Sequence, residues 1–98
     1  GDNIIQDVAL AINETRYAAA LELIAEGELR EFVCDEESSE AREYARQIYD
    51  IDQQNLQWYK AITYMRMGKW IKAKRILKDI SASDGIYKFE AQRALDLM

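Results

Sequence analysis

Residues 58–77 read WYKAITYMRMGKWIKAKRIL. This pattern predicts two amphipathic helices joined by a very tight turn at Gly68, with Ala61 and Ala73 where the two helices meet. Large aromatic side chains complement these small ones: Trp58, Tyr64 and Trp70. The combination is typical of a helical hairpin that packs closely and has neighbouring helices on both sides. We therefore expect Ala61 and Ala73 to be buried.

The same residues resemble the tetratricopeptide repeat (TPR), a 34-residue unit of two helices. Five characteristic positions of the family are matched in order: Ala61, Tyr64, Gly68, Trp70 and Ala73. Gln57 and Lys60 depart from the family, which prefers an aromatic residue and a leucine there. The resemblance covers residues 57–98 and implies an all-α, antiparallel stack of helical hairpins. Such a stack is a right-handed α-α superhelix closed by a C-terminal capping helix.

Length and composition predict one helical domain over residues 1–98. The chain has no proline, only four glycines and an apolar share of 49%, which favours helix and supplies a core. The best-matched repeat covers about residues 54–87 and the capping helix about 86–97. Residues 1–53 are expected to form irregular repeat-like helices.

Apolar periodicity predicts about six helices. They are expected at 3–12, from Arg16 onward, and at 39–51, 55–67, 69–82 and 86–97. Thr15 is a candidate N-cap for the second helix, which we expect to turn Leu29, Phe32 and Val33 inward. The polar run 52–55 predicts a connection between two helices.

Two repeat registers remain open for residues 1–53. In one, Tyr17 and Ala20 match Trp70 and Ala73 at a spacing of 53 residues, with an irregular unit between them. In the other, residues 16–34 form one helix and 39–51 its partner, so that Ala41 matches Ala73 at a spacing of 32. The second register keeps strict alternation of helix types and is preferred.

Charge is divided unevenly along the chain, whose net charge is −5. Residues 1–52 carry a net charge of −10 and residues 53–98 a net charge of +5. This asymmetry supports head-to-tail self-association or a polar partner, unless the two halves compensate one another within the molecule. A net acidic chain is a poor nucleic-acid binder, so no nucleic-acid partner is expected.

Enzymatic chemistry finds little support in the sequence. The chain has no histidine, and its single cysteine, Cys34, is expected to be a small buried hydrophobe. No phosphate-binding loop, nucleophile motif or metal-ligand spacing occurs. We therefore expect no catalytic residue, no metal and no cofactor.

The resemblance also implies a candidate binding surface. In TPR proteins the first helix of each repeat lines a concave groove, and the corresponding positions here are Asn55, Trp58, Ile62, Met65 and Arg66. Their apolar stripe suits an extended peptide or an amphipathic helix; burial against helix 39–51 is the alternative. The expected function is a non-enzymatic protein–protein interaction scaffold. A structural or self-assembly domain, with its groove filled by its own helices, is the alternative.

Residues 57–98 are similar to the C-terminal soluble part of membrane-anchored bacterial TPR proteins, some of which accompany sigma-factor regulation. This resemblance implies a periplasmic or cell-envelope setting, with the cytoplasm as the alternative. The chain begins at Gly1 without Met, from which we expect a segment of a longer protein. Membrane contact is expected only through a segment outside this chain.

Overall fold

The computed structural model describes residues 3–98, which fold into five helices. They are α1 (Ile4–Asn13), α2 (Tyr17–Glu28), α3 (Ser39–Arg66), α4 (Trp70–Ala82) and α5 (Lys88–Asp96). No strand occurs among these residues, so the all-α class is confirmed. Helices α1 and α5 agree to within two residues at each end with those expected at 3–12 and 86–97.

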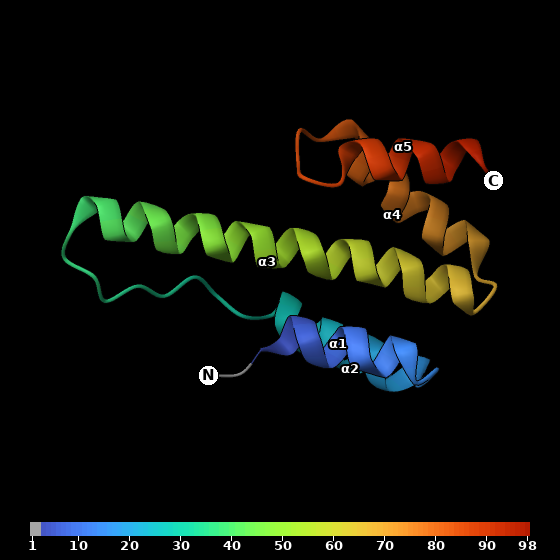
Figure 1. The fold of residues 1–98 in the computed structure, drawn as a ribbon, viewed down its shortest axis with the longest axis horizontal. Helices are drawn as coiled ribbons and strands as arrows, with labels where there is room; N and C mark the ends of the chain where they lie inside the picture. Colours follow the sequence, from blue (N-terminus) through green and yellow to red (C-terminus); the bar gives the residue numbers. More distant parts are fainter. Residues whose placement is uncertain (1–2) are drawn as a thin grey trace.

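Helix α3 is the central element of the molecule (Figure 1). The antiparallel pair α1 and α2 packs against one side of it, while α4 forms a second hairpin with it and carries α5. The arrangement is elongated, with extents of 46 × 28 × 18 Å. The N-terminal half of α3 extends beyond the other helices and is accompanied only by the chain that leads into it (Figure 1).

The two hairpin turns have the same backbone hydrogen bonds. The Arg16 amide donates to the Ala11 carbonyl at 2.8 Å, and the Lys69 amide donates to the Tyr64 carbonyl at 2.8 Å. Arg16 and Lys69 are 53 residues apart in the sequence. The hairpins are therefore equivalent at the spacing of the first register, and the preferred spacing of 32 is wrong.

A left-handed residue makes each of these turns possible. Gly68 has φ of 75° and Thr15 has φ of 59°, a region that glycine adopts without steric cost. Thr15 is consequently not the N-cap of the second helix, as the sequence predicted. Its hydroxyl donates to the Glu14 carbonyl at 2.6 Å, and Arg16 takes the cap position.

Small residues occupy the centre of both hairpins. Ala61 and Ala73 are fully buried, as expected from the sequence, and Ala20 is buried at the position equivalent to Ala73. Four residues further along each helix, on the same face, Ile24 and Leu77 are also fully buried and equivalent. Burial of these residues packs α2 and α4 closely against the helices beside them.

The expected break at residues 52–55 is absent, because α3 runs unbroken for 28 residues. Three of the four polar side chains of this run make tertiary hydrogen bonds instead of forming a turn. Each bonds a group far along the chain: Gln53 the Gly27 carbonyl, Gln54 the Ile86 amide and Asn55 the Tyr87 hydroxyl. Helices 39–51 and 55–67 are thus one helix, and the described residues contain five helices rather than six.

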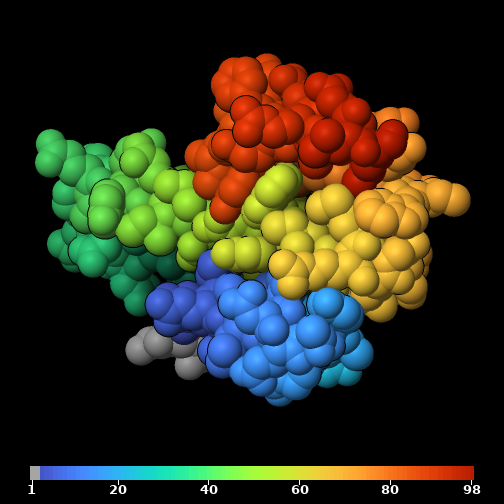
Figure 2. Space-filling view, turned by 45° about the vertical axis from the view of Figure 1, so that its right-hand side comes forward, coloured from blue at the N-terminus to red at the C-terminus, as the bar shows by residue number. Residues whose placement is uncertain are grey.

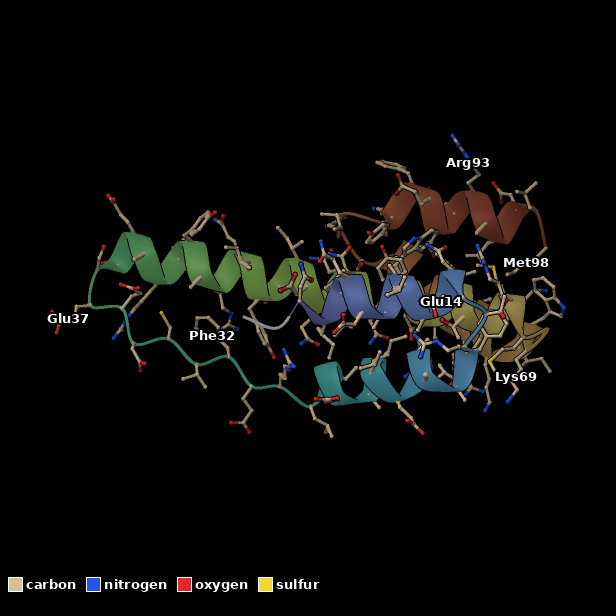
Figure 3. The ribbon with its side chains drawn as sticks, turned by 60° about the horizontal axis from the view of Figure 1, so that its bottom comes forward. Glu14, Phe32, Glu37, Lys69, Arg93 and Met98 are labelled. Atoms are coloured by element: carbon tan, nitrogen blue, oxygen red, sulfur yellow. The ribbon has the colours of Figure 1, made fainter. Side chains whose placement is uncertain are left out.

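The chain between α2 and α3 is extended, not helical. Helix α2 ends at Glu28, and Leu29 and Val33 are exposed, so the prediction that they face inward is wrong. Phe32 points from this segment toward α3 (Figure 3). Its ring centre lies 5.6 Å from that of Tyr49, whose hydroxyl donates to the Arg30 carbonyl at 2.7 Å. The Arg46 guanidinium lies 5.1 Å from the Phe32 ring centre on the same side of α3.

The core consists of two clusters that meet in α3. The first joins α1, α2 and α3 through Ile4, Val8, Ala11, Ile12, Ala20, Ile24 and Leu56. The second joins α3, α4 and α5 through Ala61, Leu77 and Ala91. Close approach in the first cluster explains Gly27 within α2, since a Cβ there would lie 2.7 Å from Leu56 Cδ1.

Candidate functional site

One face of α3 carries a continuous stripe with alternating spacings of four and three residues. Its members are Tyr44, Ile48, Ile51, Asn55, Trp58, Ile62 and Met65. This spacing keeps side chains on one face of a helix and is the pattern that packs against another helix. Four of the five residues predicted to bind a partner belong to the C-terminal half of this stripe.

The start of α5 covers the middle of the stripe. The Trp58 ring stacks on the Tyr87 ring with centres 4.9 Å apart and planes 7° from parallel. Tyr87 also donates its hydroxyl hydrogen to Asn55 Oδ1. Trp58 and Asn55 are therefore half-buried and engaged with another part of the chain.

The remaining predicted residues are distributed over both core clusters. Met65 packs with Trp58 against the second cluster, whereas Ile62 packs against the first. Arg66 is exposed at the C-terminal end of α3. A strip of α3 is visible between α5 and α1 in the space-filling view (Figure 2). The five residues thus lie along one strip, but most of their apolar surface already contacts helices of the same chain.

Burial raises the pKa of Tyr87 above its ordinary value, and the neighbouring Tyr59 and Glu90 add to this effect. The neutral phenol is therefore favoured in the folded state. An unfolded tyrosine titrates near 10.0, so above that pH the unfolded chain loses its proton first. Stability contributed by Tyr87 is intact below pH 10.0 and is lost as the pH rises toward the raised folded pKa.

We expect Tyr87→Phe to reduce the alkaline loss of stability for this reason. The free energy of unfolding, measured by urea titration between about pH 9 and pH 12, should fall less steeply in the variant than in the parent. Loss of the bond to Asn55 will lower the absolute stability at neutral pH. An equal alkaline slope in both proteins would show that Tyr87 is not held neutral by the fold.

The N-terminal half of the stripe is exposed. We call residues 39–52 of α3 the arm, and Tyr44, Ile48 and Ile51 its exposed stripe; these side chains are 67%, 43% and 42% exposed. The arm begins at a regular cap, where the Ala41 amide donates to Ser38 Oγ at 3.3 Å. This surface was not predicted from the sequence, because residues 39–51 were expected to form a separate helix that ends at a connection over 52–55. The unbroken four-three spacing across residues 52–55 was the signal that could have revealed it.

Charges on the arm are separated by side. Helical periodicity places Glu40 and Glu43 along one edge of the exposed stripe, and both are exposed. Arg42 and Arg46 lie on the opposite side, toward the extended segment, where Arg42 Nε donates to the Glu36 carbonyl at 2.7 Å. Asp50 lies on the arginine side of the helix, 3.7 Å from Arg46. The exposed stripe therefore has an acidic edge.

Chemistry-bearing groups are sparse in the part of the chain that the structure describes. Residues 3–98 hold no group of three acidic, histidine or cysteine side chains that could bind a metal ion. Cys34 was predicted to be buried, but it lies half-buried in the extended segment. Within the same residues, no helix is both long enough and apolar enough to span a membrane.

No family model, no curated protein and no solved structure matches this chain. Function is therefore inferred from the chain's own geometry. Three surface features of α3 bear on function: the exposed stripe of the arm, its acidic edge and the strip between α1 and α5.

Proposed function

We propose that this protein is a non-enzymatic interaction domain that binds an amphipathic helix of a protein partner along the exposed stripe of α3. One observation supports this proposal most strongly. Tyr44, Ile48 and Ile51 continue, without interruption, a stripe whose other half packs against helices of the same chain. A surface of this spacing accepts a helix because ridges of one helix fit the grooves of another.

The charge of the arm specifies the kind of helix. Glu40 and Glu43 border the exposed stripe, so a partner helix with lysine or arginine beside its apolar face is favoured over an acidic one. Apolar burial supplies the attraction, since fully burying one isoleucine is worth about 1.5–3 kcal/mol. Charge mainly sets the choice of partner and the rate of encounter.

We also propose a TPR-like stack as the architecture behind this surface. The proposal is supported by the two equivalent turns at Thr15 and Gly68 and by the antiparallel order of successive helices. The two equivalent turns are 53 residues apart, whereas TPR units repeat every 34 residues. The difference arises because the extended segment and the arm lie between the hairpins. The arm is then an addition to a repeat framework.

A synthetic probe tests the binding proposal directly. The probe is a labelled amphipathic helix of about 18 residues, long enough to cover the arm, with isoleucines at four-three spacing and flanking lysines. Fluorescence anisotropy should show binding to the parent, and Tyr44→Ser with Ile48→Ser should weaken it about 10-fold or more. Phe89→Ser, which alters a comparably exposed residue on α5, is the matched control and should leave affinity unchanged.

Two results would contradict the proposed function. One is failure of the basic probe to bind the parent in low salt. The other is an equal loss of affinity in the Phe89→Ser control, which would show that any exposed apolar residue captures the probe. An acidic version of the probe should bind more weakly than the basic one, because the arm edge is acidic.

A structural role within a membrane-anchored bacterial protein is the second candidate function. The stack of Trp58 on Tyr87 supports the structural role alone, because α5 of the same chain occupies the middle of the strip that a groove-binding peptide would need; the membrane anchor follows only from the resemblance of residues 57–98. In that case the cell envelope is the proposed location. Stability and probe affinity of a Trp58→Ala variant separate this candidate from groove binding.

A further inference from the structure

We infer that the helix accepted by the arm is α4 of a second copy of this chain, so that the protein associates head to tail. This inference rests on the proposed function, because it names the partner of the same exposed stripe. It is carried by the composition of α4, by the absence of intramolecular charge pairing and by a comparison between the two hairpins.

The outer face of α4 has the composition that the arm requires. Ile71, Arg75 and Lys78 follow one another at spacings of four and three residues, and Lys74 lies beside them. All four side chains are exposed, and Ile71 is 79% exposed. An apolar residue surrounded by cations thus complements an apolar stripe with an acidic edge.

Charges on this face are not neutralised within the molecule. Among residues 3–98, no carboxylate lies within 4.0 Å of the side-chain nitrogens of the α4 cations or of Lys69 before them. One ion pair joins the acidic and basic halves of the described chain, Glu28 to Lys60 at 3.3 Å. The opposite charges of the two halves are therefore left for contacts between molecules.

The equivalent helix of the first hairpin shows that the fold does not require this face. At the 53-residue spacing, Ile71, Arg75 and Lys78 correspond to Ala18, Glu22 and Ala25 of α2, which are also exposed. Core positions agree between the hairpins, since both helices bury an alanine and a branched aliphatic residue. Of these two equivalent helices, only α4 has an apolar and basic outer face.

Placement of the two surfaces favours contact between copies. Glu37, just before the arm, and Lys69, just before α4, lie at opposite ends of the molecule (Figure 3). The longest dimension is 46 Å. An arm at one end and an α4 face that starts at the other form a heterologous contact, in which different surfaces of two identical chains meet.

Complementation between two variants tests the inference. The α4 variant carries Arg75→Glu and Lys78→Glu; the arm variant carries Glu40→Lys and Glu43→Lys. Sedimentation velocity in low salt should show the parent in species heavier than its 11.4 kDa monomer, and the association constant should fall about 100-fold in either variant alone. A 1:1 mixture of the two variants should again associate, because the intact arm of one meets the intact α4 of the other.

Matched controls separate charge from fold. Glu22→Lys with Glu26→Lys on α2 changes the net charge by the same amount as the arm variant and should leave association unchanged. Circular dichroism should show equal helix content in all proteins. Raising the salt from about 0.05 M to about 0.5 M should dissociate the parent, since screening shortens the reach of these charges.

Three outcomes would overturn the inference: a monomeric parent in low salt, association of either variant at the parent's strength, or a monomeric mixture of the two variants. The basic helical probe distinguishes this failure from failure of the proposed function. If the parent is monomeric but still binds the probe through Tyr44 and Ile48, the arm accepts a helix of another protein. If neither probe nor second copy binds, both proposals fail.

Discussion

Truncation of Leu77 to alanine is expected to lower the free energy of unfolding by about 2–5 kcal/mol. Leu77 is fully buried and joins α3 and α5 to α4 through Ala61 and Ala91. Removing three carbon atoms leaves a cavity that these small neighbours cannot fill, because an alanine has no rotamer by which to move into it.

Urea denaturation followed by circular dichroism gives the measurement. Leu97→Ala is the matched control, since Leu97 is exposed and should cost less than about 0.5 kcal/mol. Ile24→Ala, at the equivalent position of the first hairpin, should resemble the Leu77 variant in its loss. A Leu77 variant as stable as the Leu97 variant would refute the second core cluster.

Replacement of Trp58 by alanine is expected to destabilise the fold by about 2–4 kcal/mol, less than for a fully buried tryptophan. The indole lies flat on Tyr87 and packs against the second cluster, so the change removes both an aromatic stack and apolar contacts. Trp70 is the matched control, because it is also a tryptophan but is mostly exposed at the start of α4.

Two measurements on the Trp58 variant separate a core role from a binding role. Its unfolding midpoint in urea should fall well below that of Trp70→Ala, whereas its affinity for the basic helical probe should change little at temperatures where it remains folded. The reverse pattern, normal stability with lost binding, would restore Trp58 to a partner-binding groove and move the site away from the arm.

The hairpin of residues 58–77 could be predicted because its signals are local. Gly68 adopts a left-handed turn, Ala61 and Ala73 are small where helices meet, and each of these features follows from residues within one hairpin. The same turn at Thr15 was harder to identify. Threonine rarely adopts positive φ, and nothing nearby in the sequence shows that the backbone requires it there.

The continuity of α3 could not be deduced in the same way. A run of aspartate, glutamine and asparagine at 52–55 favours a loop when only neighbours are considered. In the structure these amides find partners at Gly27, Ile86 and Tyr87, which lie 26 to 32 residues away. Tertiary bonding therefore outweighs local preference, and the arm exists because the helix does not break.

The five residues predicted to bind a partner lie along one strip of α3, and whether they bind one stays a prediction. Asn55, Trp58 and Met65 do share one face of α3, as their spacing requires. Their side chains nevertheless pack against α4 and α5, which no periodicity within α3 could reveal. Exposed apolar residues of the same stripe lie instead on the arm, beyond the assumed connection.

Helix α3 contributes Leu56 to one apolar cluster and Ala61, less than two turns later, to the other. If α1 and α2 melted, or if α4 and α5 melted, one side of α3 would lose its apolar contacts. The middle of α3 would then have too little burial to stay helical, since an isolated helix is marginal in water. Ordinary repeat arrays unravel one unit at a time from their ends. This chain should instead unfold as a single cooperative unit, with the shared helix coupling events on one side of the molecule to the other.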